Sequence, residues 1–321
     1  MKKETLQVRG RRLFATVLAS FMGILAFSLS AQAQLTKNYA TTAVSHSTGA
    51  AFSGTFNVPD FANASDASES TAATLNAQTI LLVLNNNSFV EIGFPANVPA
   101  GATVYIPVQD DTTQGLLSTL AGGTLGNLVT GLLGDQFIEV AVKNSTGTTL
   151  VTYSSQGNGQ RNFTQGKFNI VKDANGQTYI TFKASAGVNY SRIRITASTS
   201  GLVAASYQLK VQDAYYLSGT YDPCNPFVTT SIDATGITVG LLNGNGMPVK
   251  NAPAAIDTDT ATHSTFGYGL ATVGVGSSFS QDFYYSNLSK PGDQVKVKLR
   301  FPSSLLSANV LNTISFSAYR N

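Results

Sequence analysis

Short runs of β-branched and aromatic residues, separated by turn residues, constrain the fold of this chain more than any other feature. Gly, Asn, Asp or Pro bound most of these runs, and almost no segment has the apolar spacing of a helix. Several runs alternate apolar with polar residues, which is typical of antiparallel strands that bury one face. We therefore predict an all-β protein, with a hairpin turn at Asn175-Gly176 and strands at residues 89–94, 104–108, 137–142, 190–196 and 295–299.

An internal repeat is the second feature. The loop "NASDASESTAATL", from Asn63, returns as "NAPAAIDTDTATHSTF", from Asn251, with an aspartate and two threonines at equal offsets. The similarity continues in the same order through a glycine that lies three residues before a valine, at Gly101 and at Gly292, and then through a pair of leucines. An order preserved over this length indicates a divergent duplication in which the first copy carries a longer insertion.

The two copies differ in length. The first copy continues through several more strand patterns, whereas the second match ends at residues 314–318. We expect two tandem antiparallel β-sandwich domains of jelly-roll type, residues 34–219 and a shorter domain of residues 220–321, after a signal peptide. Pro223 and Pro226 favour this boundary, because proline cannot join a central strand. If the shorter domain lacks strands, its open sheet edge predicts a homo-oligomer or a fibre built by strand exchange.

The repeat also shares motifs with a known group of domains. Its opening loop, the segment from Phe94 to Val108, the Leu116-Leu117 pair, the closing "YSRIRI" and Asp213-Ala214-Tyr215 resemble uncharacterised repeat domains in secreted and surface proteins of Bacteroidetes-type bacteria. The opening loop is also faintly similar to discoidin-like, galactose-binding jelly rolls, although the usual glycine is missing from both copies. The resemblance implies a jelly roll or a related sandwich outside the cell, and it brings no catalytic residue.

The first 33 residues have the pattern of a secretory signal peptide. Basic residues precede an apolar run from Leu13 to Leu29, and the small residues Ala31 and Ala33 favour cleavage after Ala33. We therefore expect an extracellular or cell-surface protein with no membrane span in the mature chain. Its single cysteine, Cys224, can form no intrachain disulfide, so stability must come from packed cores. The leucine-rich residues 115–134 are interrupted by glycines, which argues against a stable helix. We expect a loop that covers an open end of the sandwich, and the alternative is an exposed apolar patch used for association.

The charge of the mature chain excludes one class of function. Of the 20 basic residues five lie in the signal peptide, and of the 17 acidic residues one does, which leaves 15 basic and 16 acidic residues. A nearly neutral chain gives no support for binding to nucleic acid or to an anionic membrane.

The supply of catalytic side chains is small. The only two histidines, His46 and His263, have no metal-ligand spacing to each other or to the cysteine, which excludes the familiar zinc sites and argues against a histidine-dependent triad. Glycoside hydrolysis needs two converging carboxylates. Glu91 and Glu139 occupy polar positions of alternating strands, where we expect a solvated face. We therefore predict no catalytic residue and a protein that is not an enzyme.

The repeated loops suggest one cofactor. Asp66 with Glu69, and Asp257 with Asp259, provide hard oxygen ligands that suit a structural Ca²⁺ ion. Asp, Ser and Thr in short loops also form turns through bonds to their own backbone, so a shared corner of the repeated fold is the simpler explanation. No other cofactor is predicted.

We expect a non-catalytic structural or adhesion protein whose partners are other surface proteins. The alternative is a carbohydrate-binding module. Because the chain has no tryptophan, exposed tyrosines would have to stack on the sugar rings of a glycan, and the candidates are Tyr215, Tyr216, Tyr284 and Tyr285.

Overall fold

The computed structural model describes residues 35–49, 55–80, 84–110, 136–155, 168–183, 189–199, 205–219, 228–237, 249–266, 275–301 and 314–318. The chain divides into two compact units, Met1–Thr36 with Ser218–Asn225, and Lys37–Leu217 with Pro226–Asn321. In the first unit only residues 35–36 and 218–219 are described, whereas strands of both repeat copies lie in the second unit. The predicted signal peptide, the leucine-rich residues 115–134 and Cys224 lie outside the described residues.

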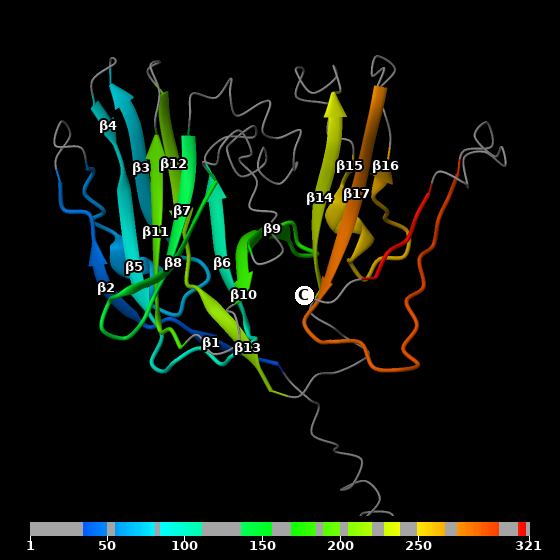
Figure 1. Ribbon diagram of the computed structural model, residues 1–321, viewed down its shortest axis with the longest axis horizontal. Coiled ribbons are helices and arrows are strands. Elements are labelled where there is room, and N and C mark those ends of the chain that lie inside the picture. Colours follow the sequence, from blue (N-terminus) through cyan, green and yellow to red (C-terminus); the bar gives the residue numbers. More distant parts are fainter. Residues whose placement is uncertain are drawn as a thin grey trace, which may run out of the picture. The chain divides into compact units, whose positions relative to one another are not determined.

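The protein is all-β, as the sequence predicts, and its strands pair antiparallel (Figure 1). The short 3₁₀ helices η1 (Phe61–Ala64) and η3 (Ala252–Ala255) lie at corresponding positions of the two copies, just before the acidic loops. No helix in the described ranges combines the length and the apolar character needed to cross a membrane. In chain order the strands are β1 (Thr36–Tyr39), β2 (Thr42–His46), β3 (Ala73–Ile80), β4 (Leu84–Asn86), β5 (Ser88–Gly93), β6 (Thr103–Asp110), β7 (Gln136–Lys143), β8 (Thr149–Ser154), β9 (Phe168–Lys172), β10 (Thr178–Lys183), β11 (Arg192–Thr199), β12 (Ala205–Val211), β13 (Tyr215–Ser218), β14 (Val228–Ile237), β15 (Val249–Lys250), β16 (Thr265–Phe266) and β17 (Val275–Tyr285).

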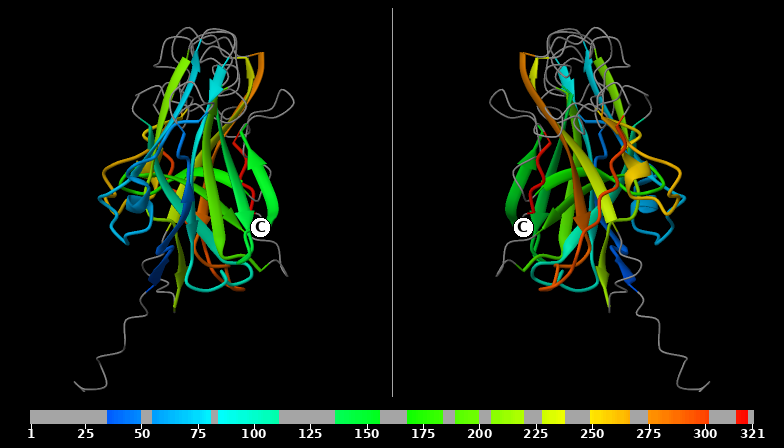
Figure 2. Two further views of the ribbon diagram at one scale, coloured as in Figure 1. Left: turned by 90° about the vertical axis from the view of Figure 1, so that its left-hand side faces the viewer. Right: turned by 90° about the vertical axis from the view of Figure 1, so that its right-hand side faces the viewer.

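The described strands form two large sheets and one small one. Sheet one has ten strands in the order β17-β14-β9-β10-β6-β12-β3-β4, with β13 paired to β6 and β1 paired to β13. Sheet two has five strands in the order β2-β5-β11-β7-β8, and β15 pairs with β16 in a separate ribbon. Seen from two sides in Figure 2, the long strands run along a common direction, as in an aligned sandwich. In sheet two, strand β11 lies between β5 and β7.

Alternating apolar residues of the two large sheets pack into one core. Strand β11 turns Ile193, Ile195 and Ala197 inward and Arg192 and Arg194 outward, as its burial pattern shows. The inward residues join the buried side chains of β5 and β7 from sheet two, and those of β3, β6, β10 and β12 from sheet one, in a single apolar cluster. This face-to-face packing is the sandwich that the alternating sequence predicts.

Most of the predicted elements are confirmed. Strands β5, β6, β7 and β11 lie where the sequence places them, and the Asn175-Gly176 turn joins β9 to β10 with Gly176 at a φ of 82°. Residues 295–299 are the exception, because they form no strand. The alternating pattern alone does not form a strand here, because the described residues provide no strand that pairs with it.

Candidate functional site

The first acidic loop is a turn closed by its own side chains. It follows η1, and the Oδ1 atom of Asp66 accepts hydrogen bonds from the backbone N–H of Ser68 and the hydroxyl of Thr71, both at 2.9 Å. Desolvation raises the pKa of Asp66, but these hydrogen bonds more than offset it, and the pKa lies below its ordinary value.

The second loop repeats this geometry. It follows η3, and Asp257 Oδ1 accepts hydrogen bonds from the backbone N–H of Asp259 at 3.1 Å and from the hydroxyl of Thr262 at 2.8 Å. The donors stand two and five residues after the aspartate in both loops, which is a spacing that chance would not repeat. Both loops therefore form the same turn, closed by an aspartate and a threonine at the same spacing.

Glu69, which we paired with Asp66 in sequence, has other partners in the structure. Its carboxylate forms an ion pair with Lys37 and accepts a hydrogen bond from the Tyr39 hydroxyl. Both interactions lower the pKa of Glu69 below its ordinary value. This side chain therefore joins β1 to the loop.

The carboxyl group that accompanies Asp66 is Asp213, which lies just before β13 and far away in sequence. Asp213 is completely buried, and its Oδ1 atom accepts a hydrogen bond from the backbone N–H of Ala67 at 2.9 Å. Its Oδ2 atom accepts none from a described residue. Burial, together with the neighbouring Asp66, raises the pKa of Asp213 to about 6. Sequence spacing does not reveal this pair, although the Asp-Ala-Tyr motif marks its second member.

Thermal unfolding can test whether the two loops bind calcium. The described residues contain no group of three or more His, Cys, Asp or Glu side chains that converges as a metal site would. Because the oxygens of Asp66 and Asp257 already accept hydrogen bonds from protein donors, we expect the same unfolding midpoint in Ca²⁺ and in chelator. A site filled at 100 times its dissociation constant would add about 2.7 kcal/mol. A calcium-dependent rise that Asp66→Ala and Asp257→Ala remove would contradict this expectation.

Tyr215 is a core residue, so the prediction that it is exposed was wrong. It is 0 % exposed and stacks on Tyr105, with 5.5 Å between ring centroids. Its ring and that of Tyr39 meet edge to face, with 5.6 Å between ring centroids. Tyr179 completes the cluster, and its hydroxyl donates a hydrogen bond to Asp173 at 3.1 Å. The face of sheet one that points away from the sandwich thus carries a second, tyrosine-rich core.

The other three candidate tyrosines differ in exposure. Tyr216 is half-buried beside Phe94, with 5.7 Å between ring centroids, and Tyr284 packs against the tyrosine-rich core. Tyr285 is 47 % exposed. Of the four tyrosines proposed to bind sugar, Tyr285 therefore presents the most accessible ring.

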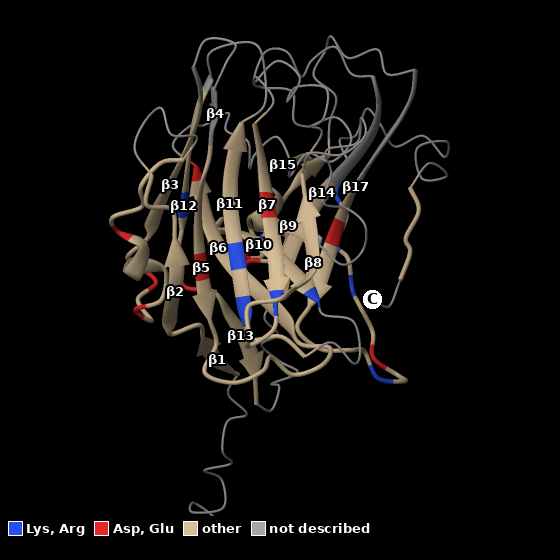
Figure 3. Cartoon of the chain, turned by 60° about the vertical axis from the view of Figure 1, so that its left-hand side comes forward, with Lys and Arg blue, Asp and Glu red and all other residues tan. Residues whose placement is uncertain are grey.

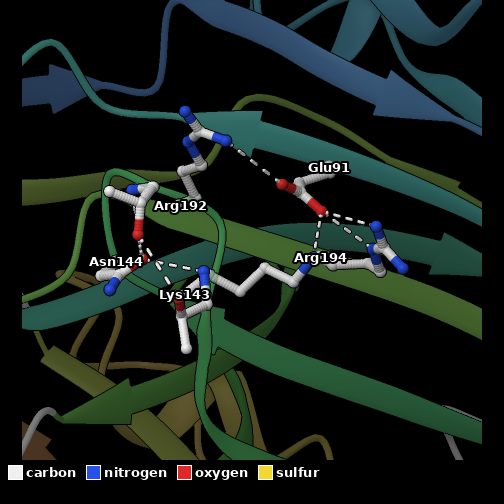
Figure 4. A network of polar contacts seen from close by, with 7 residues as sticks. Glu91, Lys143, Asn144, Arg192 and Arg194 are labelled. Carbon is white, nitrogen blue, oxygen red and sulfur yellow. Dashed lines mark hydrogen bonds and ion pairs between the residues drawn. The ribbon is translucent and has the colours of Figure 1, made fainter.

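Glu91 is also buried, which corrects the expectation of a solvated position. Its side chain is 3 % exposed, and its Oε2 atom accepts hydrogen bonds from Lys143 Nζ at 2.6 Å and from Arg194 Nε at 2.9 Å (Figure 4). Arg192 lies 3.9 Å from the other oxygen. Desolvation raises the pKa of Glu91, but the cations of Lys143 and Arg194 bring it below its ordinary value.

Neighbouring strands of sheet two bring this network together. Glu91 of β5 stands directly opposite Arg194 of β11, and Arg192 stands opposite Lys143 of β7. Figure 3 shows the basic bands on β11 and β7 beside the acidic band on β5. The Arg194 guanidinium also lies over the Phe89 ring, 4.2 Å from its centroid. These long side chains cover the carboxylate, so the network binds three strands of sheet two to one another.

The histidines lie apart from these clusters. His46 stacks on Phe61, with 3.8 Å between ring centroids, and its Nδ1 atom lies 2.9 Å from the Ser47 carbonyl oxygen. His263 is exposed in the second loop.

The second copy is where the structure differs most from the strands predicted from the sequence. Residues 293–301 and 314–318, which we call the unpaired segments, form no strand, and their apolar side chains other than Phe301 are exposed. Figure 1 draws them in orange and red without strand arrows. The exposed apolar residues are Val295 at 68 %, Val297 at 49 %, Leu299 at 46 %, Ile314 at 37 % and Phe316 at 67 %.

The fold and these clusters are the grounds for a functional proposal, since no protein-family model matches the chain and no curated protein has a significantly similar sequence.

Proposed function

We propose that this protein is an exported, non-catalytic structural or adhesion protein that works outside the cell by associating with other proteins. The observation that carries the proposal is the row of exposed apolar residues on the unpaired segments. Single exposed apolar residues are normal, but five of them at alternate positions of two β-type segments support a surface that another protein covers. Its alternating pattern suits pairing with a sheet.

The polar clusters support a structural role rather than catalysis. Glu91 is held by Lys143 and Arg194, and Asp66 is held by the turn that it closes. Protein groups therefore already satisfy these carboxylates. The signal-peptide pattern and the resemblance to repeats of bacterial surface proteins support a location outside the cell.

The test measures location and retention together. We expect a tagged chain, expressed in the bacterium that encodes it, to be found outside the membrane and to be cut by protease added to intact cells. Val297→Asp should release the chain into the medium, because it puts a charge into the proposed contact surface. Leu150→Asp is the matched control, since Leu150 is 42 % exposed on β8 of the first copy. Equal retention of both variants, or an intracellular chain, would contradict the proposal.

Carbohydrate binding is the second candidate function, and the exposed ring of Tyr285 favours it. A glycan array probed with the mature chain should then give signals that Tyr285→Ala abolishes. Signals that survive this change, or an array without signals, would exclude a sugar site at Tyr285.

A further inference from the structure

The two copies correspond position by position across their first half. The turn-forming aspartates, Asp66 and Asp257, are 191 residues apart in sequence, and so are Gly101 and Gly292, which have φ angles of 78° and 96°. A backbone in this left-handed region favours glycine. The same offset places Val295, Val297 and Leu299 where β6 has its three inward residues.

The equivalent residues have opposite environments. Val104, Ile106 and Val108 of β6 are at most 1 % exposed, whereas Val295, Val297 and Leu299 are among the most exposed apolar residues. Residues 314–318 match residues 138–142 of β7, where Ile138 and Val140 are completely buried. In the described part of the second copy, residues with the pattern of a core are therefore covered by no strand.

The first copy shows which strands those are. Strand β11 pairs with both β5 and β7, and β12 pairs with both β3 and β6. Their buried residues Ile193, Ile195 and Leu209 belong to the sandwich core. Both strands come from the closing half of the repeat, which the second match does not include.

Among the described strands, the one that corresponds to β5 pairs with a single other strand. Strand β17 pairs with β14 as β5 pairs with β2, and each pairing sets a serine opposite an acidic residue, Ser231 opposite Asp282 and Ser45 opposite Glu91. Within the described residues β17 is the end strand of sheet one (Figure 1). The position beside it is the one that β11 occupies in the first copy.

From this correspondence we infer that the second copy binds the closing half of another such repeat. The incoming β11-type strand pairs antiparallel with β17, and a β12-type strand covers the unpaired segments. The chain's own β11 and β12 are not available, because Ile193, Ile195 and Leu209 are completely buried in the first sandwich. In this mode of binding, backbone hydrogen bonds give affinity and alternate side chains give specificity.

The pattern of the partner strand follows from the register of the first copy. Ile193 of β11 stands opposite Ile92, whose equivalent in β17 is Phe283. Arg194 stands opposite Glu91, whose equivalent is Asp282. The partner strand therefore alternates aliphatic residues, which face the core, with basic residues, which face outward. The inference rests on the proposed function, since it names the protein surface that the unpaired segments bind.

A labelled synthetic peptide tests the inference directly. Its sequence is that of residues 189–217, which contains β11, β12 and the Asp-Ala-Tyr motif. We expect saturable binding to the mature chain, residues 34–321, in fluorescence anisotropy, and slower amide hydrogen exchange in residues 279–285 and 295–299. A control peptide with Ile193→Asp and Ile195→Asp should bind at least about tenfold more weakly, because it would bury charge in the core.

Variants of the full chain locate the binding site. Val297→Asp should weaken peptide binding about tenfold, whereas Leu150→Asp should leave it unchanged. Because both residues are exposed, neither change removes a core contact. Peptide binding that Val297→Asp does not weaken, or exchange protection confined to the first copy, would overturn the inference.

The remaining outcomes separate the inference from the proposed function. If the peptide fails to bind while light scattering shows the mature chain associating through Val297, the surface pairs two copies of this chain, and only the inference is wrong. If the peptide fails to bind, the chain is monomeric and cell retention is insensitive to Val297→Asp, both the inference and the proposed function are wrong.

Discussion

Replacing Glu91 with glutamine should lower the free energy of unfolding by about 3–5 kcal/mol, which is the usual cost of breaking a buried ion pair from one side. Lys143 and Glu91 have side chains that are 9 % and 3 % exposed, so glutamine would leave the Lys143 ammonium buried without its counter-charge. Arg194, which is one-third exposed, can reach water and should contribute less. Urea unfolding at pH 7 measures the change as a lower midpoint with an unaltered slope.

Glu139→Gln is the matched control for this change. Glu139 lies on the neighbouring strand β7 and is only half-buried, so we expect a change within about 0.5 kcal/mol. The double variant Glu91→Gln with Lys143→Met should recover part of the lost stability, because it removes the buried cation together with its partner. A loss below about 1 kcal/mol in Glu91→Gln would mean that the network behaves as a surface salt bridge.

The acid sensitivity of the protein should report the same network. The pKa of Glu91 is lowered in the folded state, so its ion pairs contribute stability at neutral pH. That contribution is lost as the pH falls below about 4.5, the ordinary value for glutamate, through the folded-state pKa. Glu91→Gln should therefore lose part of its disadvantage in acid.

Local sequence patterns predicted the turn and the strands whose conformation depends mainly on neighbouring residues. The Asn175-Gly176 hairpin follows from two residues that tolerate the required turn, and the strand periodicity identified β5, β6, β7 and β11. The similarity of the two loops in sequence is matched in structure, because in each loop a threonine donates a hydrogen bond to the aspartate five residues before it.

Burial by distant segments was beyond the reach of those patterns. Glu91 has the alternation of a solvated residue, yet long side chains from two other strands cover it. Tyr215 belongs to an outward face that becomes a core only because β1, β6 and β10 bring other tyrosines to it. Residues 295–299 show the converse, since periodicity states that a segment suits a sheet but not that a partner strand is present.

Replacing Asp213 with asparagine should stabilise the protein at pH 7.5 by roughly 2–3 kcal/mol and by less than about 1 kcal/mol at pH 4. Burial and the neighbouring Asp66 raise the pKa of Asp213 from 3.8 to about 6, so the folded state binds this proton more tightly than the unfolded state. The contribution of the protonated group is fully present below pH 3.8 and is lost as the pH rises through 6. An amide imitates the protonated acid at every pH, because its oxygen can accept from the Ala67 N–H and its nitrogen can donate to Asp66.

Asp60→Asn controls for the change of a carboxylate to an amide. The Asp60 carboxylate accepts a hydrogen bond from the backbone N–H of Thr74 at 3.1 Å, so we expect a modest loss of stability and no gain at pH 7.5. Unfolding in urea across pH 4 to 8 compares the wild type with both variants. If Asp213→Asn is destabilised equally at both ends of that range, burial and the neighbouring Asp66 do not raise the pKa of Asp213 as we infer. If the stabilities of the wild type and of Asp213→Asn instead separate as the pH rises through 6, the burial of Asp213 and its neighbour Asp66 explain the difference. In its charged form Asp213 is desolvated and places a second negative charge beside Asp66.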